Sequence, residues 1–293
     1  MSTALSGATI DSAGPASSSG RRPGRAKRST PRNTLTPGAG LGLGIAMLWF
    51  SLLVLFPLSA IVATAAAGGW ENYFDVLQNP QTWAALKLTV TAAALVTLLN
   101  IFMGTVIAWV LVRDKFPGKQ IVNVIIDVPF AMPTIVAGLV LLALYGPNSP
   151  LGLHWAFTVN SVYLAFAFVT LPFIVRTVQP VLEELEADVE EAAASLGAGR
   201  FTIFRRIILP SLFPAIMAGA ALSFARAISE FGSLVLLSGS RPFETEVVSV
   251  RLLSFIENGS YASAAALASV MLAVALFVIV VLDIVQRRVA RRG

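Results

Sequence analysis

Long apolar runs separated by short polar segments dominate this chain. Each run is at least as long as the roughly 18 residues that a helix needs to cross the hydrocarbon core of a bilayer. The pattern therefore predicts an all-α, polytopic membrane protein with six transmembrane helices. The predicted spans are Leu41–Ala67, Ala84–Val112, Ile121–Tyr145, Ser161–Val178, Leu212–Leu237 and Ala262–Val285.

The first run has a second interpretation, a cleaved signal peptide, because "ATA" near its end resembles a cleavage site. The apolar region of a signal peptide has only about 7–15 residues, and this run is much longer. We therefore predict that the run is retained as a span.

The composition serves mainly to exclude some classes of protein and some kinds of site. Hydrophobic residues make up 56% of the chain and charged residues 13%, whereas soluble domains carry about 25% charged residues. No cysteine occurs, and His154 is the only histidine. These counts argue against a disulfide framework, a zinc site or a Cys–His nucleophile. We expect no catalytic residue, no metal and no cofactor.

The positive charges predict which side of the membrane is cytoplasmic. Residues 1–38 are rich in Ser, Gly, Pro and Arg, which predicts a disordered basic tail ahead of a transmembrane domain over residues 39–293. The segment after the second run and the C-terminal end are basic as well. Because Lys and Arg concentrate in cytoplasmic segments, both termini are predicted to be cytoplasmic. A basic stretch beside a span more often marks this side than a nucleic-acid site, so no nucleic-acid partner is expected.

The longest cytoplasmic connection, Arg176–Arg206, has the pattern of a structured segment. "QPVLEELEADVEEAAASL" is rich in helix formers, with Pro180 at its start and acidic residues where the helix dipole favours them. Gly197 stands where a left-handed glycine ends a helix. One face of this predicted helix carries Leu182, Val189, Ala193 and Leu196.

A second, short helix is predicted after the glycine. Its apolar residues repeat at helical period, as in an amphipathic helix at a membrane surface; they are Phe201, Phe204, Ile207 and Ile208. Pro210 is expected to close this helix and turn the chain into the fifth span. The residues allow two interpretations, a solvated connection or a docking element whose small Ala192 and Ala193 let a partner approach closely.

Two prolines interrupt the third run, within "DVPFAMPTIVAG". Pro129 and Pro133 each remove a helix hydrogen bond. A broken helix at membrane depth needs protein or water around it, which suggests a translocation path. A packed kink without further function is the alternative. Asp127 lies near the start of the span and is expected to reach the cytoplasmic interface.

The fifth run contains two opposite charges, in "SFARAISEFGS". Arg226 and Glu230 are four residues apart, so they share a helix face and can pair. A charge at the bilayer centre costs about 2.5–3.5 kcal/mol, so the pair is expected to face the bundle interior or an aqueous path. A purely structural ion pair is the alternative. A ridge of small residues predicts close helix packing, including packing across a subunit interface: Ala215, Gly219, Ser223 and Ala227.

The stretch "EAAASLGAGRFTIFRRIILP" resembles the EAA signature of ABC importer permeases, and all its fixed positions are matched. They are Glu191, Ala192, Ala193, Gly197, Ile207, Leu209 and Pro210. The resemblance implies a type I ABC importer permease fold, in which the loop at about 180–210 forms the coupling helix that sits in a groove of a cytoplasmic ATPase. No G-x-x-x-x-G-K-[ST] phosphate loop occurs. We therefore expect a permease subunit that is not itself an enzyme, with ATP hydrolysis in a separate partner.

Further segments are similar to sulfate/thiosulfate importer permeases of the CysT kind, namely "PFAMPTIVAGL", "LPFIVRTVQPVLEEL" and "ARAISEFGS". The resemblance implies sulfate or thiosulfate import across the inner or plasma membrane. It also implies a CysW-like second permease, an ATPase dimer and an extracytoplasmic sulfate-binding protein as partners. The predicted path or gate residues are Pro129, Pro133, Arg226 and Glu230. Ser229 departs from the glycine usual in the family, which puts the local geometry of the gate in question.

Two other functions fit the same residues. One is an ABC permease for another oxyanion, such as molybdate or phosphate. The other is a secondary transporter that uses Asp127 or Glu230 as a proton relay. Loss of uptake with the membrane potential, but not with ATP, would favour the second.

Overall fold

The computed structural model describes residues 37–185 and 187–290, and all regular structure in that part of the chain is helical. The predicted basic tail therefore lies outside the described residues, apart from Pro37 and Gly38. The chain divides into two compact units, Met1–Ser51 and Leu52–Gly293. In the first unit, α1 (Pro37–Phe50) is an apolar helix without a charged residue. A π-helical turn, η1 (Ser51–Leu55), follows it.

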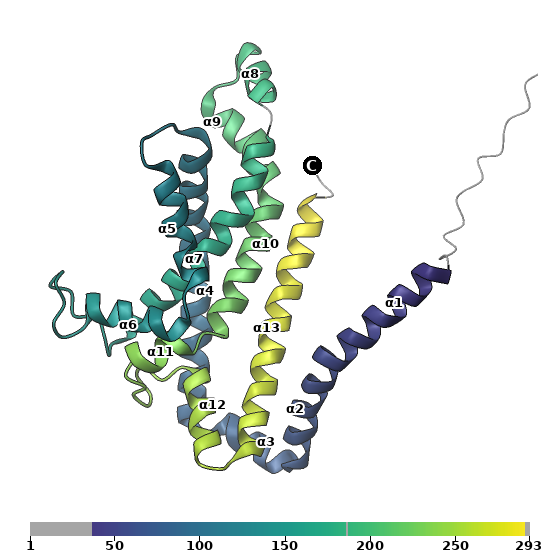
Figure 1. The fold of residues 1–293 in the computed structure, drawn as a ribbon, viewed down its shortest axis with the longest axis vertical. Helices are drawn as coiled ribbons and strands as arrows, with labels where there is room; N and C mark the ends of the chain where they lie inside the picture. The colour runs from purple at the N-terminus through teal and green to yellow at the C-terminus, as the bar shows by residue number, and fades with distance from the viewer. Residues whose placement is uncertain (1–36, 186, 291–293) are drawn as a thin grey trace, which may run out of the picture. The chain divides into compact units, whose positions relative to one another are not determined.

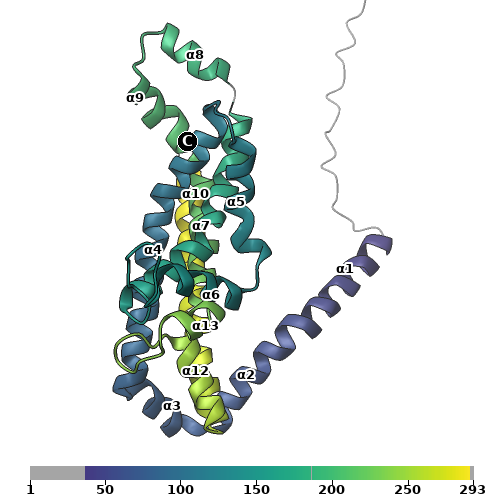
Figure 2. The same ribbon diagram turned by 60° about the vertical axis from the view of Figure 1, so that its left-hand side comes forward.

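The second unit is a bundle in which α4, α7, α10 and α13 are the long helices (Figures 1 and 2). Helices α8 and α9 lie at one end of this bundle, and α3 and α12 lie at the other. Its elements are α2 (Phe56–Ala67), α3 (Gly69–Gln78), α4 (Pro80–Arg113), α5 (Lys119–Ala131), α6 (Thr134–Tyr145), α7 (Val159–Glu184), α8 (Ala187–Ser195), α9 (Arg200–Ile203), the π-helical turn η2 (Phe204–Ile208), α10 (Leu209–Ile228), α11 (Gly232–Leu237), α12 (Val248–Glu257) and α13 (Tyr261–Ala290).

The predicted all-α membrane fold is confirmed. Five helical stretches of the described residues are long and apolar enough to cross a membrane, and the pair α5–α6 makes a sixth if it is counted as one span. The five stretches are Ala39–Ala67, Pro80–Arg113, Val159–Glu184, Arg200–Ile228 and Tyr261–Arg288.

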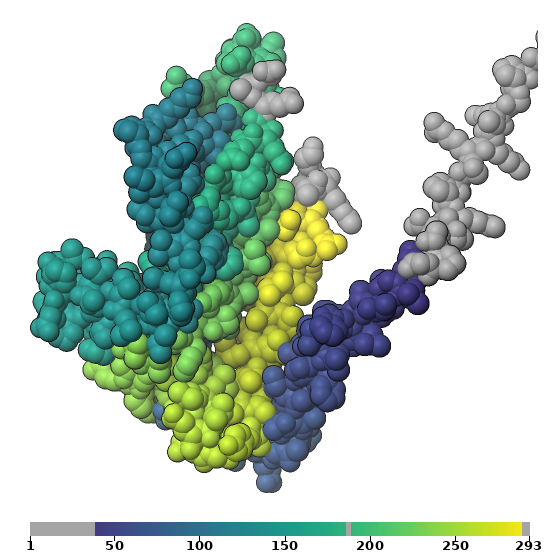
Figure 3. Space-filling model, viewed as in Figure 1, coloured from purple at the N-terminus to yellow at the C-terminus, as the bar shows by residue number. Residues whose placement is uncertain are grey.

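The third predicted span is not a continuous helix, because α5 and α6 meet at an angle of 117°. The backbone of Met132 and Pro133 is extended between them. Pro133 has no N–H to donate, and the residue before a proline is disfavoured in the helical region. The break is therefore sharper than a packed kink, and α6 with the loop after it extends to the side of the bundle (Figure 3).

The fifth predicted span, Leu212–Leu237, is wrong at its end, because α10 stops at Ile228 and α11 is a separate helix. The predicted stop at Pro210 is wrong as well, since helical structure runs without a break from Arg200 to Ile228. In η2 the N–H of Leu209 donates to the carbonyl of Phe204, five residues earlier. This π turn shifts the hydrogen bonds by one residue just before Pro210, and a proline is tolerated in the first turn of a helix.

The helix predicted to start at Pro180 is also different in the structure. Helix α7 continues through Pro180 to Glu184, and α8 starts only after an extended residue, Leu185. Val178 and Leu182 are fully buried in the core, and their packing contacts stabilise the end of α7 despite the hydrogen bond that Pro180 removes. Leu182 is thus buried in α7 while Leu196 is 90% exposed, so the predicted shared face does not exist.

Helix α7 is the centre of the bundle and packs against both α4 and α10. Two glycines allow α4 and α10 to approach Ile174 of α7 closely. A Cβ atom on Gly104 of α4 would lie 2.7 Å from Cβ of Ile174, and one on Gly219 of α10 would lie 3.2 Å from its Cα. Asn100 of α4 also donates to the Thr170 hydroxyl of α7 at 2.8 Å. At Gly219, the small-residue ridge therefore packs against α7 of the same chain.

Candidate functional site

The short helix α8 ends in a left-handed glycine, as predicted. Gly197 has a φ of +86°. Its N–H donates to the carbonyl of Ala194 (2.9 Å), and the N–H of Ala198 donates to the carbonyl of Ala193 (3.1 Å). This pair of bonds is the Schellman arrangement, which satisfies carbonyls that a helix end leaves without partners. The helix-ending conformation of Gly197 is confirmed.

One face of α8 is tied to the bundle by an ion pair. The carboxylate of Glu190 accepts a hydrogen bond from the guanidinium of Arg113, the last residue of α4. That guanidinium lies 5.7 Å from the centre of the Trp109 ring. Trp109 packs edge-on against Phe204 of η2, with ring centroids 5.8 Å apart. These contacts join α8, α4 and η2. Sequence reasoning missed the ion pair because Arg113, at the end of α4, and Glu190, in α8, are far apart along the chain.

The other face of α8 is exposed. Glu191, Ala192 and Gly197 are exposed, and so are the large apolar side chains of Leu196 and, just beyond, Phe201. Figures 1 and 2 place α8 and α9 at the end of the bundle, away from the packed helices. Clustered exposed apolar groups rimmed by polar residues mark interaction sites. The structure therefore presents α8 as a helix with one anchored face and one free face.

The second half of the predicted EAA signature lies outside α8, in η2 and at the start of α10. Ile207 is half-buried against the core, while Leu209 and Pro210 begin α10 and are exposed. Ala193, from the first half, is half-buried. The motif residues thus divide into one group on α8 and its turn and another at the start of α10.

The predicted ion pair in the fifth run is confirmed. A guanidinium nitrogen of Arg226 lies 2.7 Å from a carboxylate oxygen of Glu230, whose side chain is fully buried. The carboxylate also accepts hydrogen bonds from the N–H (3.0 Å) and the hydroxyl (2.8 Å) of Ser233. Glu230 therefore pairs with Arg226 and caps the start of α11 at the same time.

Ser229 fits its position without strain. It has a φ of −84°, its side chain is exposed, and its hydroxyl donates to the carbonyl of Arg226 at 3.1 Å. Nothing in this backbone conformation requires a glycine.

At the break between α10 and α11, the position that does require a glycine is Gly232. A Cβ atom there would lie 2.9 Å from the backbone nitrogen of Ile135 in α6. On the facing helix, a Cβ atom on Gly138 would lie 2.8 Å from Cα of Ser233. The two interrupted spans therefore meet backbone to backbone, each just after its break.

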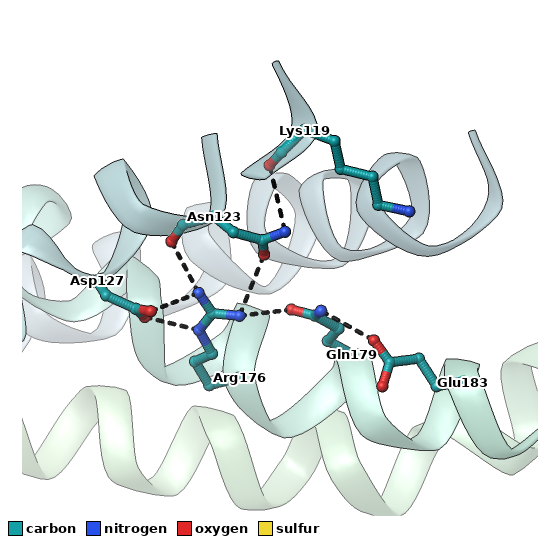
Figure 4. Close-up of polar contacts among 6 residues, drawn as sticks. All are labelled: Lys119, Asn123, Asp127, Arg176, Gln179 and Glu183. Atoms are coloured by element: carbon teal, nitrogen blue, oxygen red, sulfur yellow. Dashed lines mark hydrogen bonds and ion pairs between the residues drawn. The ribbon is translucent and has the colours of Figure 1, made fainter. Parts of the chain in front are cut away.

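A second ion pair, which sequence reasoning missed, holds α5 against α7 (Figure 4). Arg176 donates to both carboxylate oxygens of Asp127, at 2.7 Å each. Its remaining donors reach the backbone and side chain of Asn123 and the amide of Gln179. Two parallel bonds between a guanidinium and a carboxylate are among the strongest side-chain contacts. Asp127 therefore clamps α5 and does not simply extend to the interface.

A signal for this clamp was present in the sequence. Asp127 is the only charged residue of the third predicted span, and Arg176 is the only one of the fourth. Two lone opposite charges in consecutive spans are expected to pair, because either alone is costly in a membrane. Pro133 stands at the break that the clamp supports, and Pro129 lies inside α5.

Within residues 37–185 and 187–290, no group of three His, Cys, Asp or Glu side chains is placed to hold a metal ion. The arrangement offers instead a docking face at one end of the bundle and two interrupted helices with buried charges within it.

Comparisons with known proteins agree with this arrangement. Residues 100–292 match the family described as binding-protein-dependent transport system inner membrane component. The chain is 42% identical over 263 residues to the sulfate transport system permease protein CysT of Salmonella typhimurium, covering 87% of this chain and 95% of that protein. It is 41% identical over 264 residues to the protein of the same name from Escherichia coli, with the same coverage.

The fold has a counterpart among solved structures. A bacterial ABC transporter involved in the import of the acidic polysaccharide alginate has a chain that superposes with a TM-score of 0.71 at 18% identity. The match covers 85% of this chain and 94% of the other. The family match and the relatives together show that this chain belongs to the binding-protein-dependent transport system inner membrane components, as an ABC transporter permease of the CysT kind.

Proposed function

We propose that this chain is the permease subunit of an ATP-driven importer that carries sulfate or thiosulfate into the cytoplasm. The observation that supports this most directly is α8, whose motif face is exposed while its other face is held by Arg113. The names of the CysT relatives supply the substrate. The chain is not itself an enzyme, since its relatives are permeases and ATP hydrolysis belongs to a partner.

The proposed assembly has a second, CysW-like permease, a cytoplasmic ATPase dimer and an extracytoplasmic sulfate-binding protein. Residues 1–38 and the C-terminus are proposed to lie in the cytoplasm, on the side of α8, because basic residues concentrate in these segments. The groove of the ATPase would receive the face of α8 that carries Glu191 and Ala192, with Leu196 and Phe201 covered by the contact.

In this proposal, closure of the ATPases pulls on α8, and contacts of this chain transmit the pull. The ion pair of Glu190 with Arg113 links α8 to α4. Helix α4 contacts α7 at Gly104 and Ile174, where the helices are too close to slide past each other freely. Helix α7 in turn holds α5 through Arg176. A movement of α8 would thus reach the crossing of α6 and α11.

At the crossing of α6 and α11, the proposed path would let a dianion such as sulfate pass without binding it tightly. Glu230 balances the charge of Arg226, so the ion pair does not present a free cation to the substrate. Hydroxyl and backbone N–H groups near the two breaks are neutral donors, as expected of a path that must release what it binds. We propose Pro129, Pro133, Arg226 and Glu230 as residues of this path or gate.

Substrate competition tests the function. Uptake of radiolabelled sulfate is measured in cells with and without this gene, with unlabelled thiosulfate, molybdate or phosphate as competitors. We expect gene-dependent uptake that thiosulfate inhibits more strongly than molybdate or phosphate. Stronger inhibition by molybdate would instead indicate a permease for that oxyanion, which is the second candidate function.

The Gly197→Val variant tests α8 as the coupling helix. A β-branched residue resists the φ of +86°, so the turn should open and the ATPase should no longer co-purify with the permease in mild detergent. Gly118→Val is the matched control, since Gly118 has a φ of +87° and open space around it in another loop. Retained co-purification and transport in Gly197→Val would contradict the assignment.

A charge exchange tests the link between α8 and α4. Arg113→Glu alone should leave like charges facing each other and lower sulfate uptake, with the ATPase still bound. Adding Glu190→Arg restores an opposite pair and should recover much of that uptake. No difference between the single and double variants would mean that the pull travels by another route.

The Glu230→Gln variant tests the buried pair. It removes a charge of fully buried Glu230 and leaves Arg226 without its partner, so sulfate uptake should fall while the complex still assembles. Glu244→Gln is the control, because the pair of Glu244 with Arg241 is exposed. Normal uptake by Glu230→Gln would reduce the pair to a structural role.

A further inference from the structure

A half-enclosed cavity of about 360 Å³ lies between α2, α3 and α13 and belongs to neither part of the site described above. Its walls are mostly apolar, with Val62, Ala65 and Ala66 on α2 and Trp70 on α3. Its volume falls within the range of roughly 300–1,000 Å³ that is usual for ligand pockets.

The polar groups in the cavity do not require a polar ligand. The hydroxyls of Tyr73 and Ser269 both line it, and they hydrogen-bond to each other at 3.1 Å. Because each hydroxyl already has a partner, an apolar molecule can fill the space without leaving either hydroxyl unsatisfied. The cavity therefore favours an apolar occupant.

The walls of the cavity are held in place by close contacts. A Cβ atom on Gly68, at the corner between α2 and α3, would lie 2.8 Å from Cβ of Ala262 in α13. Beside it, the Ser263 hydroxyl donates to the side-chain oxygen of Asn72 at 2.7 Å. The cavity is thus a built feature of this corner and not a gap between loosely placed helices.

The cavity stands at the expected boundary of the membrane. Helix α3 begins two residues after the apolar stretch Ala39–Ala67 ends, and it lies at the end of the bundle opposite α8 (Figures 1 and 2). Trp70 and Phe74 are 77% and 54% exposed, and the acidic Glu71 and Asp75 are exposed beside them. Aromatic residues with charges alongside are typical of a helix that lies in the membrane interface.

We propose that this cavity binds one acyl chain of a membrane phospholipid, with α3 lying in the interface above it. Trp70 covers the chain from the side of the interface, and the small Ala65 and Ala66 leave room for it along α2. The lipid would fix the corner between α2 and α3 in the leaflet opposite α8. This inference does not depend on the transported anion.

Photo-crosslinking in a bilayer tests the proposal. The assembled transporter is reconstituted into vesicles of phosphatidylethanolamine and phosphatidylglycerol that contain a trace of phosphatidylcholine with a diazirine in one acyl chain. After illumination, labelled residues are located by mass spectrometry. We expect labelling concentrated on α2 and α3 between Val62 and Tyr73, and on α13 at Ser269.

Two variants on one helix give the matched comparison. Ala66→Phe fills the cavity and should lower this labelling several-fold. Ala63→Phe adds the same side chain to α2 at an exposed position that does not line the cavity, and it should leave labelling unchanged. If Ala66→Phe does not assemble, Val62→Trp fills the same space from an exposed position.

Two results would overturn the proposal. One is equal labelling in the filled variant and its control, or labelling spread evenly over all lipid-facing helices. The other comes from a parallel preparation with a photoreactive amino acid at residue 66, namely a crosslink from it to a neighbouring protein chain, which would mean that protein and not lipid covers the cavity. Sulfate uptake by the reconstituted Ala63→Phe variant, measured in parallel, separates these outcomes from a failure of the proposed transport function.

Discussion

The close approach of three helices at Ile174 is the contact on which the bundle depends. Lipid tails are as apolar as leucine, so helices in a membrane associate through close packing more than through the hydrophobic effect. Gly104 and Gly219 bring α4 and α10 onto the same residue of α7 from two sides. Helix α5 is attached to α7 by Arg176, and α13 packs against α10. Helices α4, α5 and α10 are therefore positioned directly against α7, and α13 is positioned through α10.

The two interrupted spans satisfy a second demand of the bilayer, which offers no water to free backbone groups. At the first break, the N–H of Met132 still donates to the carbonyl of Val128. At the second, the carboxylate of Glu230 accepts from the N–H of Ser233, which would otherwise have no partner at the start of α11. The backbones of α6 and α11 then cover each other at Gly138 and Gly232. The breaks are thus stabilised by their surroundings.

The sequence predicted those features that depend on local pattern. Apolar runs gave the spans, Gly197 gave the end of α8, and the spacing of Arg226 and Glu230 gave their ion pair. Prediction from the sequence failed where tertiary contacts determine the bounds of a helix. Pro180 resembles a helix start, yet burial of Leu182 extends α7 through it.

One of the two ion pairs between distant residues could not be predicted from the sequence pattern. Nothing in the sequence relates Arg113 to Glu190, because both lie in polar segments with several other charges. The clamp of Asp127 and Arg176 could have been inferred, since each is alone in its span. Which face of α6 meets α11 is likewise set by tertiary packing, where Gly138 and Gly232 let the two backbones approach.

The helical segment Arg200–Ile228 is continuous through Pro210, with a π turn at η2 and Pro214 inside α10. At 1.5 Å per residue its 29 residues extend over about 42 Å. Phe201 stands at one end, beside the free face of α8, and Arg226 stands at the other, beside the crossing of α6 and α11. A tilt of about 5° around the middle of a rod of this length would shift each end by roughly 2 Å. Such a shift is comparable to the helix displacements that switch other proteins between states.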